Sequence, residues 1–454
     1  MLWTLWAPDA WPAAFQLDAR TEAQVYELPA YRGTDAQNPV LLPRRRIVQY
    51  LTLDGFELVR GEDFGFETSL RVFADLGLPP GEATLLDGVR STGMDLLYAS
   101  VRYRKGGTEV QLGRQMYVDL MDYLSFDGLR VRYVSPWGLG AEAYGGLWVK
   151  GSSLFSSSVY QPDGTRETDA RRLALLAPAT DPSLGSAEPL WGAKVLLENL
   201  GGVFASVGYR KSWLDGYSDF ERAAVEVKYG RGLGLSAGGG AEYDILSRQA
   251  SQFRAQVRYD GSAWAVTAEA LRVAPVLSSQ SIWYYFANGS RDEVHLRGDY
   301  TPMGPVRYYL QLVGAQYETV INGTDMAIAS ILPSVPAALN AGGSAGAALH
   351  LTRFRAAADV TYRDGYGGRQ LWVDLTGGTF ADKDRYTLDG RLSLAAIQDA
   401  QNPLLAGTFG GLQVWGGYRL TPATRVSLVF EENVNAFAHF DTKVFFVFDL
   451  RAQG

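Results

Sequence analysis

The chain has 454 residues, a formal net charge of −7, 51 glycines, 25 tyrosines, 11 tryptophans and no cysteine. A modest negative charge excludes a protein whose affinity comes from concentrated Lys and Arg, so nucleic acid is not an expected partner. No apolar run has the length and purity of a membrane helix. No linker or change of pattern divides the chain, and we therefore expect one large repetitive domain.

The first residues differ from the rest. The segment Leu2 to Ala7 is short and apolar, and Trp11 to Phe15 is similar to the end of a signal peptide, but no Lys or Arg occurs before Arg20. We interpret residues 1–14 as a signal-peptide remnant or a disordered tail, and residues 15–454 as the folded domain.

From Met94 to Lys150 the sequence predicts two successive β-hairpins. Every second residue from Leu97 to Tyr103 is apolar or aromatic, and the residues between them from Ser100 to Arg104 are polar or charged. This period of two gives a strand two faces of different chemistry. Lys105-Gly-Gly reverses the chain, and a less regular connection follows Leu112 before the alternation resumes at Gly128.

The same succession of hairpins repeats along the chain, with short turns at one end of the strands and long connections at the other. Short turns include Lys105-Gly-Gly107, Pro136-Trp-Gly138, Asp260-Gly-Ser262 and Thr421-Pro-Ala-Thr424, and long connections include Gly77–Thr92, Gly151–Pro189, Val273–Asp292 and Glu318–Gly343. This asymmetry is typical of bacterial outer-membrane β-barrels. We predict an all-β chain forming a single transmembrane antiparallel β-barrel of about 22 strands, with short periplasmic turns and long extracellular loops. Counts of 18 to 22 are compatible with the pattern, and Gln370–Thr376 is its weakest strand.

Tyrosines recur on the apolar face of the predicted strands. We expect them to form an aromatic girdle at the membrane interface beside the short turns. The residues are Tyr103, Tyr133, Tyr209, Tyr229, Tyr259 and Tyr362. The apolar face of the barrel as a whole is expected to contact outer-membrane lipid and lipopolysaccharide.

One pair of motifs carries a family resemblance. Gln111-Leu-Gly-Arg-Gln115, followed by Phe126-Asp-Gly-Leu-Arg130, resembles a pattern of alginate-export-type outer-membrane β-barrels and related porins. The resemblance implies passive export of an anionic polysaccharide through an arginine-lined pore. By matching position, it implies that Arg114 and Arg130 line that pore.

If the apolar face meets lipid, the charged face lines the lumen, and its basic residues cluster near the short turns. Such a basic zone would concentrate anionic solutes at the periplasmic mouth. The alternative is that glutamates on the same strands, such as Glu109, Glu142 and Glu226, neutralise these bases across strands. The candidate pore-lining basic residues are Arg102, Arg104, Arg114, Arg130, Arg132, Lys228, Arg258, Arg307 and Arg425.

Three aromatic residues, Tyr144, Trp148 and Trp415, fall on the lumenal phase of the alternation. They can stack on sugar rings, or they can pack against a loop that folds into the barrel. The stretch Met326–Leu349 contains no charged residue. Because it contains prolines and glycines, we interpret it as a long connection that folds over or into the pore.

Enzyme chemistry is not expected. Gly234-Leu-Ser-Ala-Gly238 fits the G-x-S-x-G spacing but lies within a strand pattern rather than at a strand-to-helix elbow. A hydrolase would need a histidine beside an acid at the outer rim, where His439 and Asp441 are the positions to inspect. No metal motif occurs, and the predicted transport needs no cofactor.

We predict an outer-membrane pore for passive passage or export of an anionic saccharide or polysaccharide. One alternative is a general diffusion porin. Another is a structural barrel that anchors a secretion, polysaccharide or motility assembly through periplasmic export partners.

Overall fold

The computed structural model describes residues 14–30, 40–77, 92–119, 121–149, 188–214, 216–230, 234–274, 290–318, 338–365, 368–382, 384–398, 406–435 and 440–453. Within these ranges, 22 strands form one antiparallel sheet. They are β1 (Ala14–Ala30), β2 (Val40–Phe56), β3 (Asp63–Asp75), β4 (Thr92–Lys105), β5 (Thr108–Asp119), β6 (Asp122–Val134), β7 (Leu139–Trp148), β8 (Pro189–Leu200), β9 (Val203–Leu214), β10 (Tyr217–Gly230), β11 (Leu235–Asp244), β12 (Gln249–Asp260), β13 (Trp264–Val273), β14 (Arg291–Tyr300), β15 (Val306–Tyr317), β16 (Ala338–His350), β17 (Phe354–Asp364), β18 (Arg369–Ala381), β19 (Tyr386–Gln398), β20 (Gly407–Thr421), β21 (Thr424–Val434) and β22 (Asp441–Gln453).

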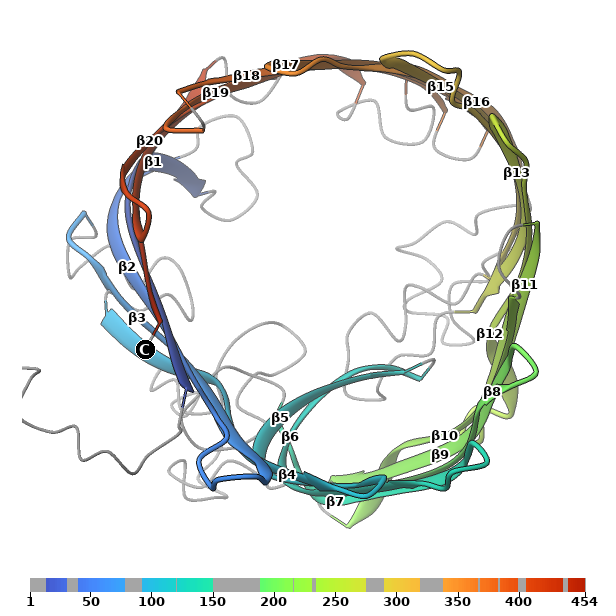
Figure 1. The fold of residues 1–454 in the computed structure, drawn as a ribbon. Coiled ribbons are helices and arrows are strands. Elements are labelled where there is room, and N and C mark those ends of the chain that lie inside the picture. The colour runs from blue at the N-terminus through green and yellow to red at the C-terminus, as the bar shows by residue number, and fades with distance from the viewer. Residues whose placement is uncertain are drawn as a thin grey trace, which may run out of the picture.

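The sheet closes on itself. β1 pairs with β22 from Gln16 opposite Gln453 to Val25 opposite Val444, and the strands form a ring when viewed along the barrel axis (Figure 1). In hydrocarbon an unpaired backbone group has no water to bind, so closure removes the edge that an open sheet would expose. The predicted closed barrel of about 22 strands is confirmed, and the marginal segment Gln370–Thr376 lies within β18.

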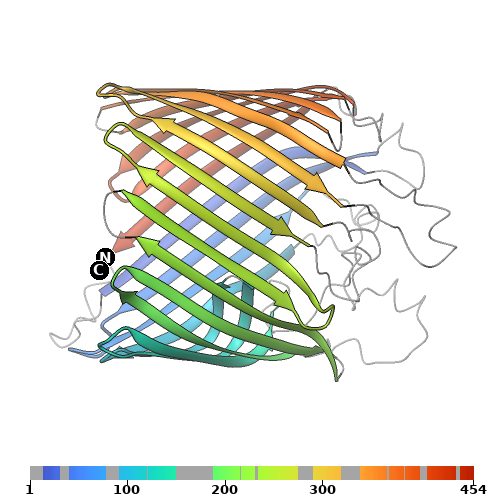
Figure 2. The ribbon, with the colours of Figure 1, turned by 90° about the vertical axis from the view of Figure 1, so that its right-hand side faces the viewer.

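The two faces of the wall differ as the alternation predicted. Val195, Val207 and Val225 lie opposite one another on neighbouring strands, and all three are exposed on the outside of the barrel. Lys194, Ser206 and Glu226, each one residue away on the same strands, lie on the opposite face of the wall. Strands tilted across the ring (Figure 2) therefore present apolar groups to lipid and polar groups to the lumen. In the described part of the chain, no helix is long and apolar enough to span a membrane.

Aromatic rings pair along the short-turn rim on the lipid-facing side. The ring centroids are 5.2 Å apart for Tyr259 and Trp264, 6.4 Å for Tyr300 and Tyr308, and 5.0 Å for Tyr386 and Tyr418. Amphipathic rings at this height fit the headgroup layer of a membrane.

Two of the predicted girdle residues lie elsewhere. Tyr209 is in the second half of β9 and Tyr362 in the second half of β17, and both strands begin at a short turn. Both side chains therefore lie nearer the opposite rim. Alternation fixes the face of a side chain, but its height depends on where the strand begins.

The prediction of a long connection over Met326–Leu349 is wrong for its second part, because Ala338–His350 is strand β16. Residues 319–337 lie outside the described residues. Small side chains hide the alternation in β16, and the packing explains them. A Cβ built on Gly346 would lie 2.4 Å from the ring of Tyr309 and 2.3 Å from Oδ1 of Asp359, two side chains that share a hydrogen bond across this position.

The orientation of the wall predicts a loss of stability at only one of two adjacent residues in the middle of β15. Leu312 is 53% exposed on the lipid face, and Gln311 points into the lumen. Leu312→Arg should destabilise the barrel by about 2–4 kcal/mol, because its charge would lie in hydrocarbon. Folding titrations in lipid vesicles measure this difference. Gln311→Arg is the control, and an equal loss in both variants would contradict the assigned faces.

Candidate functional site: the lumen and its inward hairpin

The outer half of the β5–β6 hairpin leaves the barrel wall. β5 pairs with β4 only between Thr108 and Arg114, and β6 pairs with β7 only between Phe126 and Val134. Beyond these points β5 and β6 pair with each other as far as Asp119 opposite Asp122. Figure 1 shows this part curving into the interior of the barrel. The stretch that looked irregular in the sequence is thus a continuous hairpin that enters the lumen.

A row of three glycines lies where the hairpin bends. Gly113 in β5 is opposite Gly128 in β6, and Gly128 is opposite Gly146 in β7. A Cβ on Gly113 would lie 2.3 Å from the carbonyl oxygen of Ala99, and one on Gly128 would lie 2.1 Å from that of Gly145. Gly113 also has a φ of +121°, which side chains disfavour. Close backbone approach and a positive φ together allow the sharp bend.

Arg114 holds the bend rather than offering its charge to the lumen. Its guanidinium donates to both carboxylate oxygens of Asp127, at 2.7 Å and 2.8 Å, and its Nη1 donates to the carbonyl oxygen of Leu96 at 3.0 Å. Only 2% of the Arg114 side chain is exposed. The Leu96 carbonyl lies on the part of β4 from which β5 has departed. Arg114 therefore ties the hairpin to the strand that it leaves.

Beyond the bend, an apolar cluster packs the hairpin against the wall. Tyr117, Leu124 and Phe126 from the hairpin are buried with Tyr144 from β7 and Leu190 from β8. Removing each such side chain from water contributes about 1.5–3 kcal/mol. The cluster fixes the hairpin against β7 and β8.

Arg210 of β9 anchors the tip. Its side chain is fully buried, forms a salt bridge with Asp119 at 2.9 Å, and donates to the hydroxyl of Tyr144 at 3.0 Å. Its Nη1 also approaches the carbonyl oxygen of Met121 at 3.5 Å. A buried guanidinium needs such partners because its desolvation is costly. The network therefore fixes the tip of the hairpin to β9.

Near the short turns, the wall beside the hairpin carries charges that alternate from strand to strand. Arg104, Glu109, Arg132, Glu142 and Lys194 lie successively opposite one another from β4 to β8. Arg104 contacts Glu109 at 2.5 Å, and Arg132 contacts Glu198 in β8. Opposite charges directly across a ladder stabilise the sheet. In this sector, acidic residues on neighbouring strands therefore neutralise the bases, as in the alternative given for the basic zone.

Arg130 and Arg102 belong to the neighbouring row. Arg130 contacts Glu142 at 3.1 Å and Glu109 at 3.2 Å, and its guanidinium lies 5.5 Å from the ring centroid of Tyr117. Arg102 approaches Asp63 only at 3.9 Å. Of these two arginines, Arg130 is thus built into the base of the hairpin, and Arg102 is the less constrained.

A short turn at this rim holds a further ion pair. Glu62, between β2 and β3, accepts hydrogen bonds from Lys105 at 2.6 Å and from the Tyr103 hydroxyl at 2.9 Å. The contact with Lys105, more than that with Tyr103, lowers the pKa of Glu62 below its ordinary value. The carboxylate therefore stays ionised, and it offsets the charge of Lys105.

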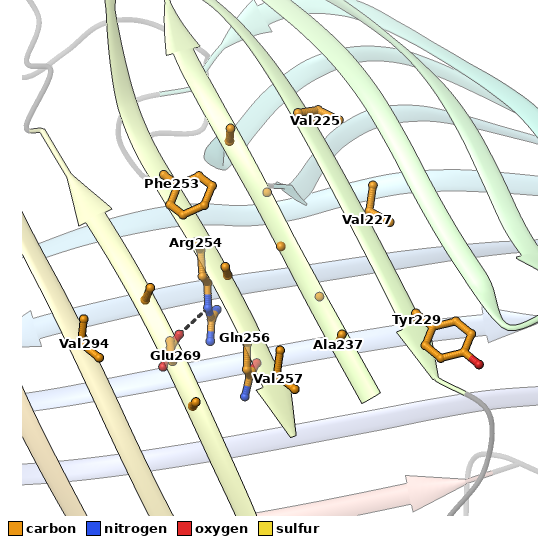
Figure 3. Close-up of a pocket in the computed structure, with 17 residues that line it drawn as sticks. Val225, Val227, Tyr229, Ala237, Phe253, Arg254, Gln256, Val257, Glu269 and Val294 are labelled. Carbon is orange, nitrogen blue, oxygen red and sulfur yellow. Dashed lines mark hydrogen bonds and ion pairs between the residues drawn. The ribbon is translucent and has the colours of Figure 1, made fainter. Parts of the chain in front are cut away.

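Lys228 of β10 and Arg258 of β12 lie on the panel formed by β10 to β13, where Figure 3 shows the neighbouring Arg254 beside Glu269. Lys228 contacts Glu226 at 2.8 Å, Arg258 contacts Asp260 at 2.7 Å, and their neighbour Arg254 contacts Glu269 at 2.6 Å. The segment Ser236–Ala241 of β11 between them has only small side chains. A hollow of about 340 Å³ lies on its lumenal face, and an apolar groove of about 660 Å³ lies on its lipid-facing side.

Arg307 and Arg425 lack carboxylate partners among the described residues. Arg425 donates instead to the hydroxyl of Thr387 at 2.6 Å. Sequence reasoning missed Arg419, which lies directly opposite Arg425 and also has no described ion-pair partner. The opposition of these two arginines can be recognised only when β20 and β21 are aligned in register, and the alternation within one strand does not give that alignment.

The predicted lumenal aromatics separate into two groups. Tyr144 is buried in the hairpin cluster, and Trp148 packs against it and meets Phe220 edge to face at 5.4 Å. These two side chains support an inward-folded segment, which is one of the two roles predicted for them. Trp415 lies in β20, opposite Asp389 and away from the hairpin.

Acidic side chains surround one of the described histidines. His295 lies in β14, with Nε2 at 3.0 Å from Glu293 and Nδ1 at 3.7 Å from Glu269. Within the described ranges no serine hydrogen bonds to this histidine. Those ranges also contain no group of three or more His, Cys, Asp or Glu residues arranged to hold a metal ion. His439 lies outside the described residues.

These features define the class of protein. A closed antiparallel barrel with an apolar exterior, an aromatic rim and a charged lumen is an integral protein of the bacterial outer membrane.

Comparisons with solved structures found similar chains, and a superposition with a TM-score above 0.5 supports this fold. The siderophore receptor PirA from Pseudomonas aeruginosa superposes with a TM-score of 0.58 at 11% identity, over 96% of this chain and 80% of that one. A BenF-like porin from Pseudomonas fluorescens Pf-5 gives a TM-score of 0.46 at 10% identity, over 97% and 99% of the two chains. OccK5 from Pseudomonas aeruginosa gives 0.44 at 9% identity, over 97% and 98%. No family model and no curated protein matches the chain.

Removal of the Arg210 side chain should loosen the hairpin tip and leave the rest of the barrel unchanged. Arg210→Ala leaves Asp119 buried without its partner, and we expect the hairpin tip to lose about 3–5 kcal/mol of stability while the barrel stays closed. Hydrogen exchange of the amides from Tyr117 to Tyr123 should accelerate, and exchange in β15 should not. Replacing both partners with apolar residues, Arg210→Met with Asp119→Leu, is the control and should restore most of the protection. Unchanged exchange in Arg210→Ala would contradict the role of Arg210 in holding the hairpin tip.

Proposed function

We propose that the protein is a passive outer-membrane channel for hydrophilic solutes, narrowed on one side by the β5–β6 hairpin. The observation that carries this proposal is the charged and polar lumenal face of the wall, which continues past the hairpin to the strands on the far side of the ring. A polar lumen in a barrel of this width favours passage of water-soluble molecules.

We further propose that the channel prefers anions, with an anionic saccharide as the favoured cargo. The hairpin sector has ion-paired bases and contributes little net field. Arg307, Arg419 and Arg425 on the other strands have no described carboxylate partner, and such bases raise the local concentration of anions. The lumenal Trp415 offers an aromatic face of the kind on which sugar rings stack.

A general diffusion porin is the second candidate. The alternating row from Arg104 to Lys194 favours it, because a balanced wall selects weakly by charge. A passive channel sets no direction of transport, so export and uptake depend on where the solute is made. A structural barrel that binds periplasmic partners would show no conductance at all.

Reversal potentials in a salt gradient across planar bilayers test the proposal. The wild-type channel should conduct with a preference for chloride over potassium. Neutralising Arg307, Arg419 and Arg425 to glutamine should weaken that preference, because it removes three charges that no described carboxylate offsets.

The control is an ion pair of the hairpin sector. Arg104→Gln combined with Glu109→Gln changes no net charge, so selectivity should be preserved. Absence of conductance would overturn the channel. Conductance without anion preference would leave the general porin as the better assignment.

A further inference from the structure

A cavity of about 570 Å³ lies at the short-turn end of the lumen, where β1 and β22 close the barrel. It spans the seam between the first and last strands and reaches the turn between β20 and β21. Its charged lining consists of Arg20, Arg419, Arg425, Arg451, Asp18 and Asp449.

The carboxylates of this region are already engaged by two of the arginines. Arg451 contacts Asp18 at 2.6 Å. Arg20 contacts Glu22 at 2.7 Å and Asp449 at 3.9 Å. Arg419 and Arg425 are left without a described carboxylate within ion-pair distance, although they lie directly opposite each other on neighbouring strands. Like charges in this position destabilise a sheet unless something offsets them.

The side chain of Arg425 also points away from the carboxylate that lies opposite it in the sheet. Asp449 of β22 lies opposite Arg425 in the ladder, yet the guanidinium reaches the other way and donates to Thr387 of β19. It lies flat across Gly417 of β20, where a Cβ would be 2.6 Å from its Nη2. The group is thus held on the same side as Arg419, away from Asp449. A glycine at position 417 is what leaves it room.

We propose that this cavity binds an oxyanion, the carboxylate, sulfate or phosphate group of an anionic solute, between Arg419 and Arg425. A guanidinium presents a planar fork of donors that matches such a group, and two forks facing one anion offset their mutual repulsion. The inference rests on the proposed function, because it supplies a binding station at the periplasmic mouth of the channel. It places the recognition of anions at one site rather than along a diffuse basic zone.

Calorimetric titration of inorganic phosphate into the detergent-solubilised full chain tests the site. We expect saturable binding to the wild type. Arg419→Gln and Arg425→Gln should each weaken it about tenfold or more, as loss of a charge-assisted hydrogen bond does. Gly417→Ala should also weaken it, although it removes no charge, because the added methyl displaces the Arg425 guanidinium.

Arg385→Gln is the matched control. Arg385 lies at the neighbouring turn and donates to the Tyr418 hydroxyl at the aromatic rim, so phosphate affinity should not change. Retention of the heat-dependent gel shift of a folded barrel verifies each variant. Phosphate that fails to bind the wild type, or that binds all three site variants equally well, would overturn the site. Conductance without phosphate binding would overturn the site alone, and phosphate binding without conductance would overturn the channel alone.

Discussion

The structure depends on the need to hydrogen bond every backbone group that faces hydrocarbon. A sheet meets that need only by closing, and the pairing of β1 with β22 closes this one. The lumen is not under the same constraint, because water and side chains can satisfy polar groups there. This difference allows β5 and β6 to leave the ladder at Arg114 and Phe126 and to continue inside the barrel as a two-stranded hairpin that is held by side-chain contacts.

The departure of the hairpin gives the lumen two unlike sides. The hairpin side is held by an apolar cluster, a buried Arg210 and rows of paired charges, so its groups are committed to structure. The other side, from β15 through the seam, contains Arg307, Arg419 and Arg425, which have no described carboxylate partner. In the channel proposed above, the paired groups of the hairpin side stabilise the fold, and the arginines of the other side are the candidates for solute recognition.

Much of the fold follows from local sequence. A period of two along β7, with turn residues on either side, fixes a strand and its faces without knowledge of its neighbours. Contacts between strands do not follow in this way. Gly113, Gly128 and Gly146 become one bend only in register, and the opposition of Arg419 to Arg425 likewise needs two aligned strands. β16 was missed because its glycines accommodate side chains from neighbouring strands, which no single-strand pattern records.

The inward position of the hairpin can be tested at one residue, because the chain contains no cysteine. Val118 is 73% exposed, on the face of the hairpin that points away from the wall. Single-channel current through Val118→Cys should fall stepwise when a charged, membrane-impermeant thiol reagent is added, since the adduct would stand in the lumen. The same reagent should leave the lipid-facing variant Val207→Cys unaffected. Failure of Val118→Cys to react, or reaction without any change in current, would contradict a hairpin folded into the conducting lumen.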